Sequence, residues 1–285
     1  MMNVLITGKS GYIASKLVKE LENIHDVDSI SLRGEEGLNI DFSSFDVLIH
    51  TAGIAHVSYN ESESNIYDEV NYLLTMRVAE KAKQASVKQF IFMSSMLVYG
   101  ESQSKKDFID ENTPPQPTNP YGKSKYHAEK CLLALQDDSF KVVILRLPMV
   151  YGPNSQGNYP ALSKFAKQVP IFINVKNKRS MIYIEHLTKL ITNIIDTKLE
   201  GIYYPQNNEA VSTSEIIKAI RKVHNRKTLI LPFPYWLLRA LMVIHPIFRK
   251  VFGSQVYKND ISRHDLNYTP FSFLETIRKT EGNIS

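Results

Sequence analysis

The sequence predicts an α/β protein built on a doubly wound parallel sheet, with a smaller lobe near its C-terminus. Two patterns in the 285 residues carry this prediction. The first half alternates short apolar runs with amphipathic segments, which is typical of parallel strands connected by crossover helices. Beyond Pro148 Gly, Pro and Asn become frequent, and residues 148–160 in particular have the composition of a loop.

Five apolar runs of the first half are expected to be strands of this sheet. They show no strict alternation with polar residues, because helices cover both faces of a parallel sheet and bury both sides of each strand. In chain order, the predicted strands are residues 3–7, 28–32, 45–52, 88–95 and 141–147.

The segments between and after these runs predict helices and a few shorter strands. Residues 11–22 place Ile13, Leu17 and Leu21 on one helical face. The other predicted elements are helices at 66–85 and 121–136, a strand followed by a helix within 179–196, a short strand at 201–205 and a helix at 212–224.

The composition is that of an ordinary globular protein, and it narrows the range of partners. Hydrophobic residues make up 43% and charged residues 22%, with a mild formal net charge of +5. The sequence contains no long run of Lys and Arg of the kind that would indicate a nucleic-acid partner. The single cysteine, Cys131, excludes an intramolecular disulfide. His50, His56 and His127 lack metal-ligand spacing, so we expect no metal site.

Neither a targeting segment nor a membrane span is expected. The stretch MMNVLITGKSGYIA reaches glycines and a lysine too early for a signal peptide, and no apolar run approaches the roughly 18 residues of a membrane span. A reducing cytoplasm is therefore the expected location. The basic, apolar residues 235–252 could associate weakly with a membrane surface, or could pack within the C-terminal lobe.

The stretch TGKSGYIA, residues 7–14, lies between the first predicted strand and its helix. Gly8 and Gly11 permit a tight turn whose backbone N–H groups can approach a pyrophosphate, and the helix N-terminus adds positive potential. A plain strand–helix turn is the competing interpretation, but this position at the first junction favours a dinucleotide site. The residues expected to contact the cofactor here are Gly8, Lys9, Ser10, Gly11, Tyr12 and Ile13.

The stretch YGKSK places Tyr121 and Lys125 at i, i+4 spacing, on one face of a predicted helix. A phenol with a pKa near ~10 is a poor acid or base at neutral pH, but a neighbouring ammonium lowers that pKa and makes proton transfer practicable. Ser94 and Ser95 end the fourth predicted strand, at the sheet edge where parallel sheets bind ligands. Together these residues favour chemistry on a carbonyl or hydroxyl group.

These motifs resemble the extended short-chain dehydrogenase/reductases that act on nucleotide sugars. The likeness covers residue 2 to about residue 200 and rests on TGKSGYIA, NYLL around Asn71, SSMLVYG, YGKSK, LRLPMVYGP and RSMIYIEHL. It implies a Rossmann NAD(P)-binding domain formed by residues 1–147 and 181–203. Residues 148–180 and 204–285 would form a smaller C-terminal substrate-binding lobe.

The resemblance also assigns roles to individual residues. It implies Tyr121 as the acid/base, Lys125 on the nicotinamide ribose, Ser95 orienting the sugar oxygen and Asn71 organising the site, so these four form the expected catalytic set. Arg179 would hold the substrate diphosphate, which suits a guanidinium fork, with Ser94 and Ser95 as further substrate contacts. The remaining expected cofactor contacts are Arg33, Asp41, Phe42, Ala52, Gly53 and Pro148, in addition to Tyr121 and Lys125. His186 is expected to pack or hydrogen-bond at a helix start rather than to react.

Within that family, the chain looks most like bacterial capsule and O-antigen enzymes that reduce UDP-2-acetamido-2,6-dideoxy-4-ketohexoses. The expected reaction is NADPH-dependent reduction of the C4 ketone to a UDP-N-acetyl-6-deoxyhexosamine (UDP-QuiNAc or UDP-FucNAc) for surface polysaccharide. An NAD-dependent nucleotide-sugar 4-epimerase is the alternative, although Met149 stands near the place of an asparagine that many epimerases carry. A 4,6-dehydratase fits less well, because Met96 and Leu97 stand where an acidic pair is expected. A non-catalytic dinucleotide-sensing protein is a distant third.

The residues after the second predicted strand bear on the choice of cofactor. The stretch SISLRG carries Arg33 at the place where NAD-binding proteins put an acid for the adenosine ribose. An arginine can accept a 2′-phosphate, and Lys9 could add charge to the same pocket, so NADP(H) is the preferred cofactor and NAD(H) the other candidate. By resemblance, a homodimer is expected through the helices around 65–85 and 120–136.

Overall fold

The computed structural model describes residues 1–34, 36–55, 64–101, 108–175, 177–234, 253–259, 261 and 266–282. The chain divides into two compact units. The first comprises Met1–Gly100, Pro115–Leu147 and Leu187–Pro205, and the second Glu101–Pro114, Pro148–His186 and Gln206–Ser285. The apolar segment 235–252 and His56 lie outside the described residues.

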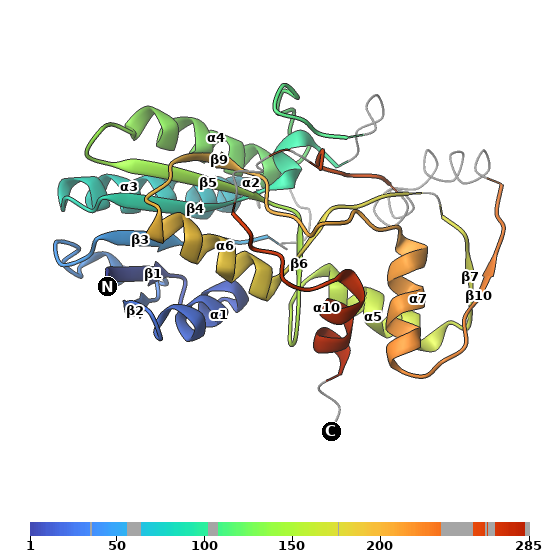
Figure 1. Cartoon of the computed structure of the whole chain (residues 1–285). Helices are drawn as coiled ribbons and strands as arrows, with labels where there is room; N and C mark the ends of the chain where they lie inside the picture. The colour runs from blue at the N-terminus through green and yellow to red at the C-terminus, as the bar shows by residue number, and fades with distance from the viewer. Residues whose placement is uncertain are drawn as a thin grey trace. The chain divides into compact units, whose positions relative to one another are not determined.

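A six-stranded parallel sheet forms the centre of the first unit (Figure 1). Its strand order is β2-β1-β3-β4-β5-β9, so the direction of winding reverses between β1 and β3. Ligands of such sheets bind at the carboxyl ends of the strands beside this reversal. The strands are β1 (Asn3–Thr7), β2 (Asp26–Ile30), β3 (Val47–His50), β4 (Gln89–Ser95), β5 (Lys141–Leu147) and β9 (Gly201–Tyr203). The predicted fold class, a doubly wound parallel sheet, is confirmed.

Helices cover both faces of this sheet, α1 and α6 on one side and α3 and α4 on the other (Figure 1). The apolar runs of β3 and β4 are accordingly buried along their whole length. The helices are α1 (Tyr12–Leu21), α2 (Ser64–Tyr67), the π-helical turn η3 (Asp68–Leu73), α3 (Leu74–Gln84), α4 (Pro120–Leu135) and α6 (Ile184–Asp196). Short 3-10 turns are η1 (Glu36–Leu38) and η4 (Met96–Tyr99).

Two of the differences between the predicted and the observed elements arise because pairing partners elsewhere in the chain decide them. The second strand is Asp26–Ile30 rather than 28–32, since it pairs with β1 from Asn3 to Thr7. The predicted loop 148–160 contains the strand β6 (Met149–Tyr151), which pairs with β8 (Met181–Tyr183). Such long-range pairing leaves no signature in local composition.

In the part of the second unit that the structure describes, short strands pair with one another and α5, α7 and α10 form the helices. β6 pairs with β8, and β7 (Ile171–Ile173) pairs with β10 (Leu229–Leu231). The helices α5 (Asn158–Gln168) and α10 (Phe273–Glu281) pack against α7 (Thr213–Val223). Ser212 and Ser272 begin α7 and α10 with complete capping boxes, which satisfy backbone N–H groups that a helix start leaves unpaired.

The two compact units differ from the predicted domains in three segments: 101–114, 181–186 and 204–205. Glu101–Pro114 lies with the second unit, where Ile109 forms a backbone bridge to Tyr257. β8 also lies there, because its partner is β6 rather than a strand of the large sheet. Among the described residues, no helix combines the length and the apolar character needed to cross a membrane.

Candidate active site

Gly8 shapes the turn between β1 and α1. Its φ is +88°, and a Cβ there would lie 2.8 Å from both the Ala52 backbone N and Thr51 Oγ1, so a side chain does not fit. The Gly8 and Lys9 N–H groups donate to the Ile30 carbonyl at 2.9 and 3.0 Å. Gly11 is the N-cap of α1 and provides no side-chain cap, which leaves the first helical N–H groups to other partners. This cradle fits a dinucleotide pyrophosphate.

Arg33 lies beyond the end of β2, on the surface. β2 stops at Ile30, and the three residues that follow are Ser31, Leu32 and Arg33, none of them acidic. The Arg33 backbone N–H donates to Ser31 Oγ at 3.2 Å, which shapes the turn, and the guanidinium is exposed. The strand end next to Gly8 therefore carries a positive charge.

Asp41 and Phe42 lie between β2 and β3 and have quite different surroundings. The Asp41 carboxylate is exposed and accepts hydrogen bonds from the Ser43 N–H at 2.9 Å and the Ser43 hydroxyl at 2.7 Å, which lower its pKa. The Phe42 ring is fully buried in the core and lies under Lys81 Nζ, 4.7 Å from the ring centroid. Only the backbone of Phe42 is left for the cofactor contact that the resemblance implies.

Asn71 on η3 forms hydrogen bonds both to the loop after β3 and to α4. Its Oδ1 accepts from the Ile54 N–H at 2.9 Å, and its Nδ2 donates to the Ile54 carbonyl at 3.0 Å and to Ser124 Oγ at 3.3 Å. A Cβ on Gly53 would lie 2.9 Å from Asn71 Oδ1 and 3.2 Å from Lys125 Nζ. The loop of Ala52 and Gly53 therefore lies directly against Lys125.

His50 supports this arrangement from β3, a role that the sequence did not suggest. Thr75 Oγ1 donates to the Asn71 carbonyl at 2.9 Å and so must accept from His50 Nε2 at 3.0 Å, leaving His50 Nδ1 to accept from Thr7 Oγ1 at 2.8 Å. Burial, and then the nearby Lys125 charge, lower the pKa of His50 to about 3. A neutral ring therefore links β1 to the turn that carries Asn71.

Ser95 and Tyr121 meet because α4 begins against the end of β4. Asn119 Oδ1 caps α4 by accepting from the Gly122 N–H at 2.7 Å. A Cβ on Gly122 would lie 2.5 Å from the Leu97 carbonyl oxygen, so the glycine permits this close approach. Ser95 ends β4 and accepts from the Leu97 N–H at 3.2 Å. The Ser95 hydroxyl lies close enough to Tyr121 to lower the pKa of its phenol.

The pKa of Tyr121 is raised, opposite to the direction expected from the sequence. Burial is the main cause, the Ser95 hydrogen bond opposes it, and Tyr67, whose ring centroid lies 6.0 Å away, adds to the rise. Lys125 is not among the groups that shift the pKa of Tyr121. Burial lowers the pKa of Lys125 itself to about 7, and the charge of Glu129 opposes this shift. Lys125 is 4% exposed, with Nζ 4.5 Å from the centroid of the Phe92 ring.

A buried ion pair lies beside Lys125 and was not foreseen. Arg146 Nη2 donates to Glu129 Oε2 at 2.7 Å, and Arg146 Nε lies 3.2 Å from both carboxylate oxygens. Ser94, expected to contact the substrate, instead donates its hydroxyl to Glu129 Oε1 at 2.5 Å and is 3% exposed. The sequence feature that could have indicated this ion pair is Arg146, a lone arginine inside the apolar run of β5.

In the second unit, Arg179 and His186 have well-defined surroundings. The Arg179 backbone exchanges hydrogen bonds with Val211 at 2.9 and 3.0 Å, and its Nε donates to the Gly253 carbonyl at 3.2 Å. Burial lowers the pKa of the Arg179 guanidinium to about 10.

His186 Nε2 accepts from the Phe271 N–H at 3.3 Å, so His186 Nδ1 donates to Asn207 Oδ1 at 3.0 Å. His186 is therefore a buried neutral ring with both nitrogens engaged. Pro148 follows β5 and is buried.

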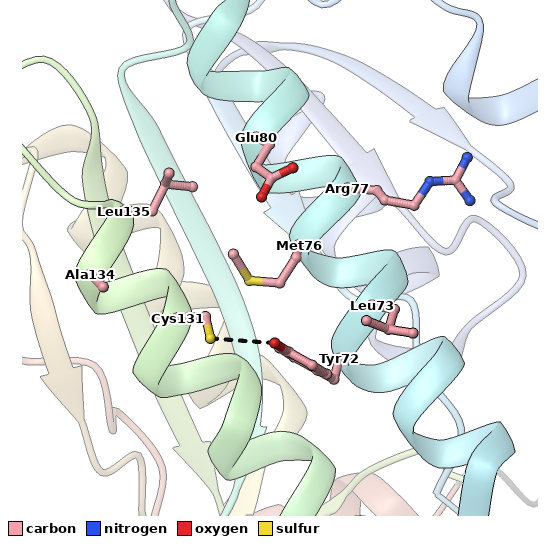
Figure 2. Close-up of a pocket in the computed structure, with 8 residues that line it drawn as sticks. All are labelled: Tyr72, Leu73, Met76, Arg77, Glu80, Cys131, Ala134 and Leu135. Carbon is pink, nitrogen blue, oxygen red and sulfur yellow. Dashed lines mark hydrogen bonds between the residues drawn. The ribbon is translucent and has the colours of Figure 1, made fainter.

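A groove of about 660 Å³ lies on a different face of α4 from Lys125 and Glu129. Figure 2 shows Tyr72 from η3 and Cys131 from α4 pointing toward one another across it, with 3.6 Å between Oη and Sγ. Its lining residues are Tyr72, Leu73, Met76, Arg77, Glu80, Cys131, Ala134 and Leu135. None of them belongs to the expected catalytic set. Within the described ranges, no cluster of three or more His, Cys, Asp and Glu side chains is placed to hold a metal ion.

Known proteins share both the sequence pattern and the fold. The sequence profile of the NAD dependent epimerase/dehydratase family matches residues 4–205. The UDP-glucose 4-epimerase of Vibrio cholerae is 30% identical over 91% of this chain and 84% of that protein. The N-acetyl-alpha-D-glucosaminyl-diphospho-ditrans,octacis-undecaprenol 4-epimerase of Escherichia coli O157:H7 is 25% identical over 83% and 77%. The UDP-glucuronic acid 4-epimerase from Bacillus cereus in complex with NAD superposes with a TM-score of 0.76, at 22% identity over 99% of this chain and 98% of that one.

The parallel sheet, the Gly8 turn and the Tyr121–Lys125 pair define a dinucleotide-binding protein of the short-chain oxidoreductase class. The profile match over more than half of the chain makes the identification more specific. The chain belongs to the NAD dependent epimerase/dehydratase family, so the predicted resemblance to extended short-chain dehydrogenase/reductases is confirmed.

Proposed function

We propose that the protein is a nicotinamide-dependent 4-epimerase of a UDP-activated hexose or N-acetylhexosamine. The observation that carries this proposal is that Ser95 lies near enough to Tyr121 to lower the pKa of its phenol, one helical turn from Lys125 in a family of NAD dependent enzymes. Among the similar proteins, those named 4-epimerases favour epimerisation over the net reduction preferred from the sequence.

The proposed mechanism uses proton transfer at Tyr121 twice. Gly8, Gly11 and Lys125 would hold a nicotinamide dinucleotide, which would supply reversible hydride transfer at the sugar C4. Tyr121 Oη accepts the proton of the C4 hydroxyl during oxidation and returns it to the C4 oxygen during reduction. The Ser95 hydroxyl hydrogen-bonds that oxygen, and a charged Lys125 stabilises the phenolate. Gly8 and Gly11 leave room for the cofactor pyrophosphate, and Arg179 binds the sugar nucleotide diphosphate.

The test is an incubation of the purified protein with UDP-glucose or UDP-N-acetylglucosamine, catalytic NAD and no added reductant. The expected product is the C4 epimer, identified by NMR. We expect Tyr121→Phe to lower kcat by about 10²–10⁴-fold, the usual contribution of a general acid–base, while dinucleotide binding followed by fluorescence is retained. Full activity in Tyr121→Phe would contradict the mechanism.

A second candidate is supported by the surface around Arg33. This candidate is the NADPH-dependent reduction of a UDP-2-acetamido-2,6-dideoxy-4-ketohexose to a UDP-N-acetyl-6-deoxyhexosamine for surface polysaccharide. The absence of an acid among Ser31, Leu32 and Arg33 favours a 2′-phosphorylated cofactor. Incubation with UDP-N-acetylglucosamine, a 4,6-dehydratase and NADPH would then consume one NADPH per product. Epimerisation without NADPH consumption would rule this candidate out.

A further inference from the structure

The small sheet of β7 and β10 in the second unit has one apolar side exposed (Figure 1). Alternate residues of a strand and their register partners point to the same side of a sheet, and on this side they are Ile171, Ile173, Leu229 and Leu231. Ile171, Leu229 and Leu231 are 51%, 54% and 42% exposed. The intervening Phe172 is 8% exposed, so the other side of the sheet packs within the unit. We call the exposed side the β7–β10 face.

The chain segments that form this face carry basic residues and no acidic ones. Residues 139–184, which contain β7, and residues 216–259, which contain β10, include no Asp or Glu in the sequence. Arg226 and Lys227 come directly before β10, and both are exposed. The border of the β7–β10 face at the start of β10 is therefore positively charged.

Hydrogen bonds hold this basic turn in place. Arg221 on α7 donates from Nη2 to the Lys227 carbonyl at 2.5 Å and from Nη1 to the Ala166 carbonyl on α5 at 2.8 Å. The Leu229 N–H donates to the Pro170 carbonyl at 3.0 Å, which joins the beginning of β10 to the beginning of β7. The two cations and the apolar side chains thus belong to one connected piece of structure.

Two carboxylates on neighbouring helices do not cancel this charge. Glu281 on α10 is 7% exposed and is already paired with Lys167 at 3.0 Å and with His224 at 2.8 Å. Glu215 belongs to the capping box at the first turn of α7, whereas Arg226 follows the last turn of that helix.

We propose that the β7–β10 face, with Arg226 and Lys227 at its border, binds the surface of a membrane that contains anionic lipids. The aliphatic side chains would lie among the acyl chains just below the headgroups, and the two cations would meet lipid phosphates. Charge selects this partner, because two copies of the face would bring like charges together, whereas an anionic surface is complementary. The proposal goes beyond the reaction at Tyr121 and does not depend on it.

The test is co-sedimentation of the full-length protein with lipid vesicles. Vesicles of phosphatidylcholine alone are compared with vesicles of phosphatidylcholine and phosphatidylglycerol in equal amounts. We expect binding to the anionic vesicles to be about tenfold tighter, because two cations near such a surface act together. Added salt should weaken this binding, because it screens the attraction between exposed charges.

Two double variants separate the apolar contribution from the electrostatic one. Ile171→Ser/Leu229→Ser should weaken binding to the anionic vesicles about tenfold, because the apolar area that leaves water is lost. Arg226→Gln/Lys227→Gln should weaken binding to the anionic vesicles to a similar degree and leave any binding to phosphatidylcholine alone unchanged. All four substituted side chains are exposed, so circular dichroism should show folded proteins.

The matched control is Lys19→Gln/Lys88→Gln, which removes two exposed charges from the first unit and should bind anionic vesicles as the wild type does. The proposal is overturned if the wild type does not bind these vesicles, or if Ile171→Ser/Leu229→Ser binds them as tightly as the wild type. It is also overturned if, without lipid, this variant sediments as one chain where the wild type sediments as two, since a second copy would then cover the face. Vesicle binding needs neither sugar nor cofactor, so its outcome is separate from that of the product analysis.

Discussion

Arg33 is the residue on which the choice between NAD and NADP depends. Its guanidinium is exposed just past β2, and none of the described residues Ser31, Leu32 and Arg33 at the strand end is an acid that would bind an unphosphorylated ribose. A 2′-phosphate placed there would gain a charge-assisted hydrogen bond.

We therefore expect Arg33→Ala to raise the Kd for NADPH about tenfold, which corresponds to about 1.4 kcal/mol of binding free energy. The Kd for NADH should change less than twofold. Fluorescence titrations with both cofactors give the comparison, and Lys19→Ala, at the far end of α1, is the control for a general loss of surface charge. Equal effects on both cofactors would show that Arg33 does not contact the phosphate.

At the level of elements, the start of α4 decides whether the site is assembled. Gly122 has no positive φ and lies inside a helix, where alanine is ordinarily more stable by about 1 kcal/mol. Here a Cβ would meet the Leu97 carbonyl at 2.5 Å, so the helix would have to move away from η4.

Gly122→Ala should thus lower the free energy of unfolding by about 1–3 kcal/mol, the usual range for overpacking, and lower kcat more than tenfold. Denaturant unfolding and steady-state kinetics measure the two effects. Lys123→Ala changes the adjacent, exposed position of the same helix and should remain within about 0.5 kcal/mol of wild type. A Gly122→Ala protein as stable and active as wild type would contradict the close packing of α4 on η4.

At the level of the whole molecule, His50 should make stability depend on pH. The folded protein binds the His50 proton only near pH 3, whereas an unfolded chain binds it near the ordinary value of about 6.5. Between these two pH values the unfolded chain binds more protons than the folded protein. Lowering the pH therefore increases the fraction of molecules that are unfolded.

The free energy of unfolding should accordingly decrease below pH 6.5 by up to about 1.4 kcal/mol per pH unit from this residue. Denaturant unfolding at a series of pH values measures the slope. His50→Gln should flatten it, even if the variant is less stable at pH 7. His127→Gln, on the exposed side of α4, should leave the slope as it is. An unchanged slope in His50→Gln would disprove the assignment.

Association of two chains is the other property at this scale. By resemblance, we expect a homodimer formed through η3, α3 and α4, the helices that border the groove in Figure 2. Leu73 is 49% exposed there, which is consistent with a face that another chain covers.

Sedimentation of the wild-type protein should give the mass of two chains, and Leu73→Glu should shift it toward one, because a carboxylate would be buried in the contact. Ile24→Glu is the control, since Ile24 is 46% exposed at the end of α1, away from these helices. A wild-type protein that sediments as a single chain at every concentration would refute the expectation.

The sequence by itself determined the strands and helices with strong local patterns. β5 begins and ends at the predicted residues, and α4 differs from its prediction by one residue at each end. The family could also be predicted, because its motifs are short stretches in which neighbouring residues act together. The Gly8 turn is one of these stretches.

Only the tertiary structure decided the features that depend on residues far apart in the chain. Pairing with β1 moved the second strand to Asp26–Ile30, and pairing with β8 created β6 within a predicted loop. Burial gave Tyr121 a raised pKa where the local spacing of Lys125 predicted a lowered one. Ser94 likewise donates its hydroxyl hydrogen bond to Glu129, a residue 35 positions away. The physical reason is the same in each case: periodicity and turn chemistry are local, whereas register, desolvation and the partner of a buried charge are set by the packing of distant segments.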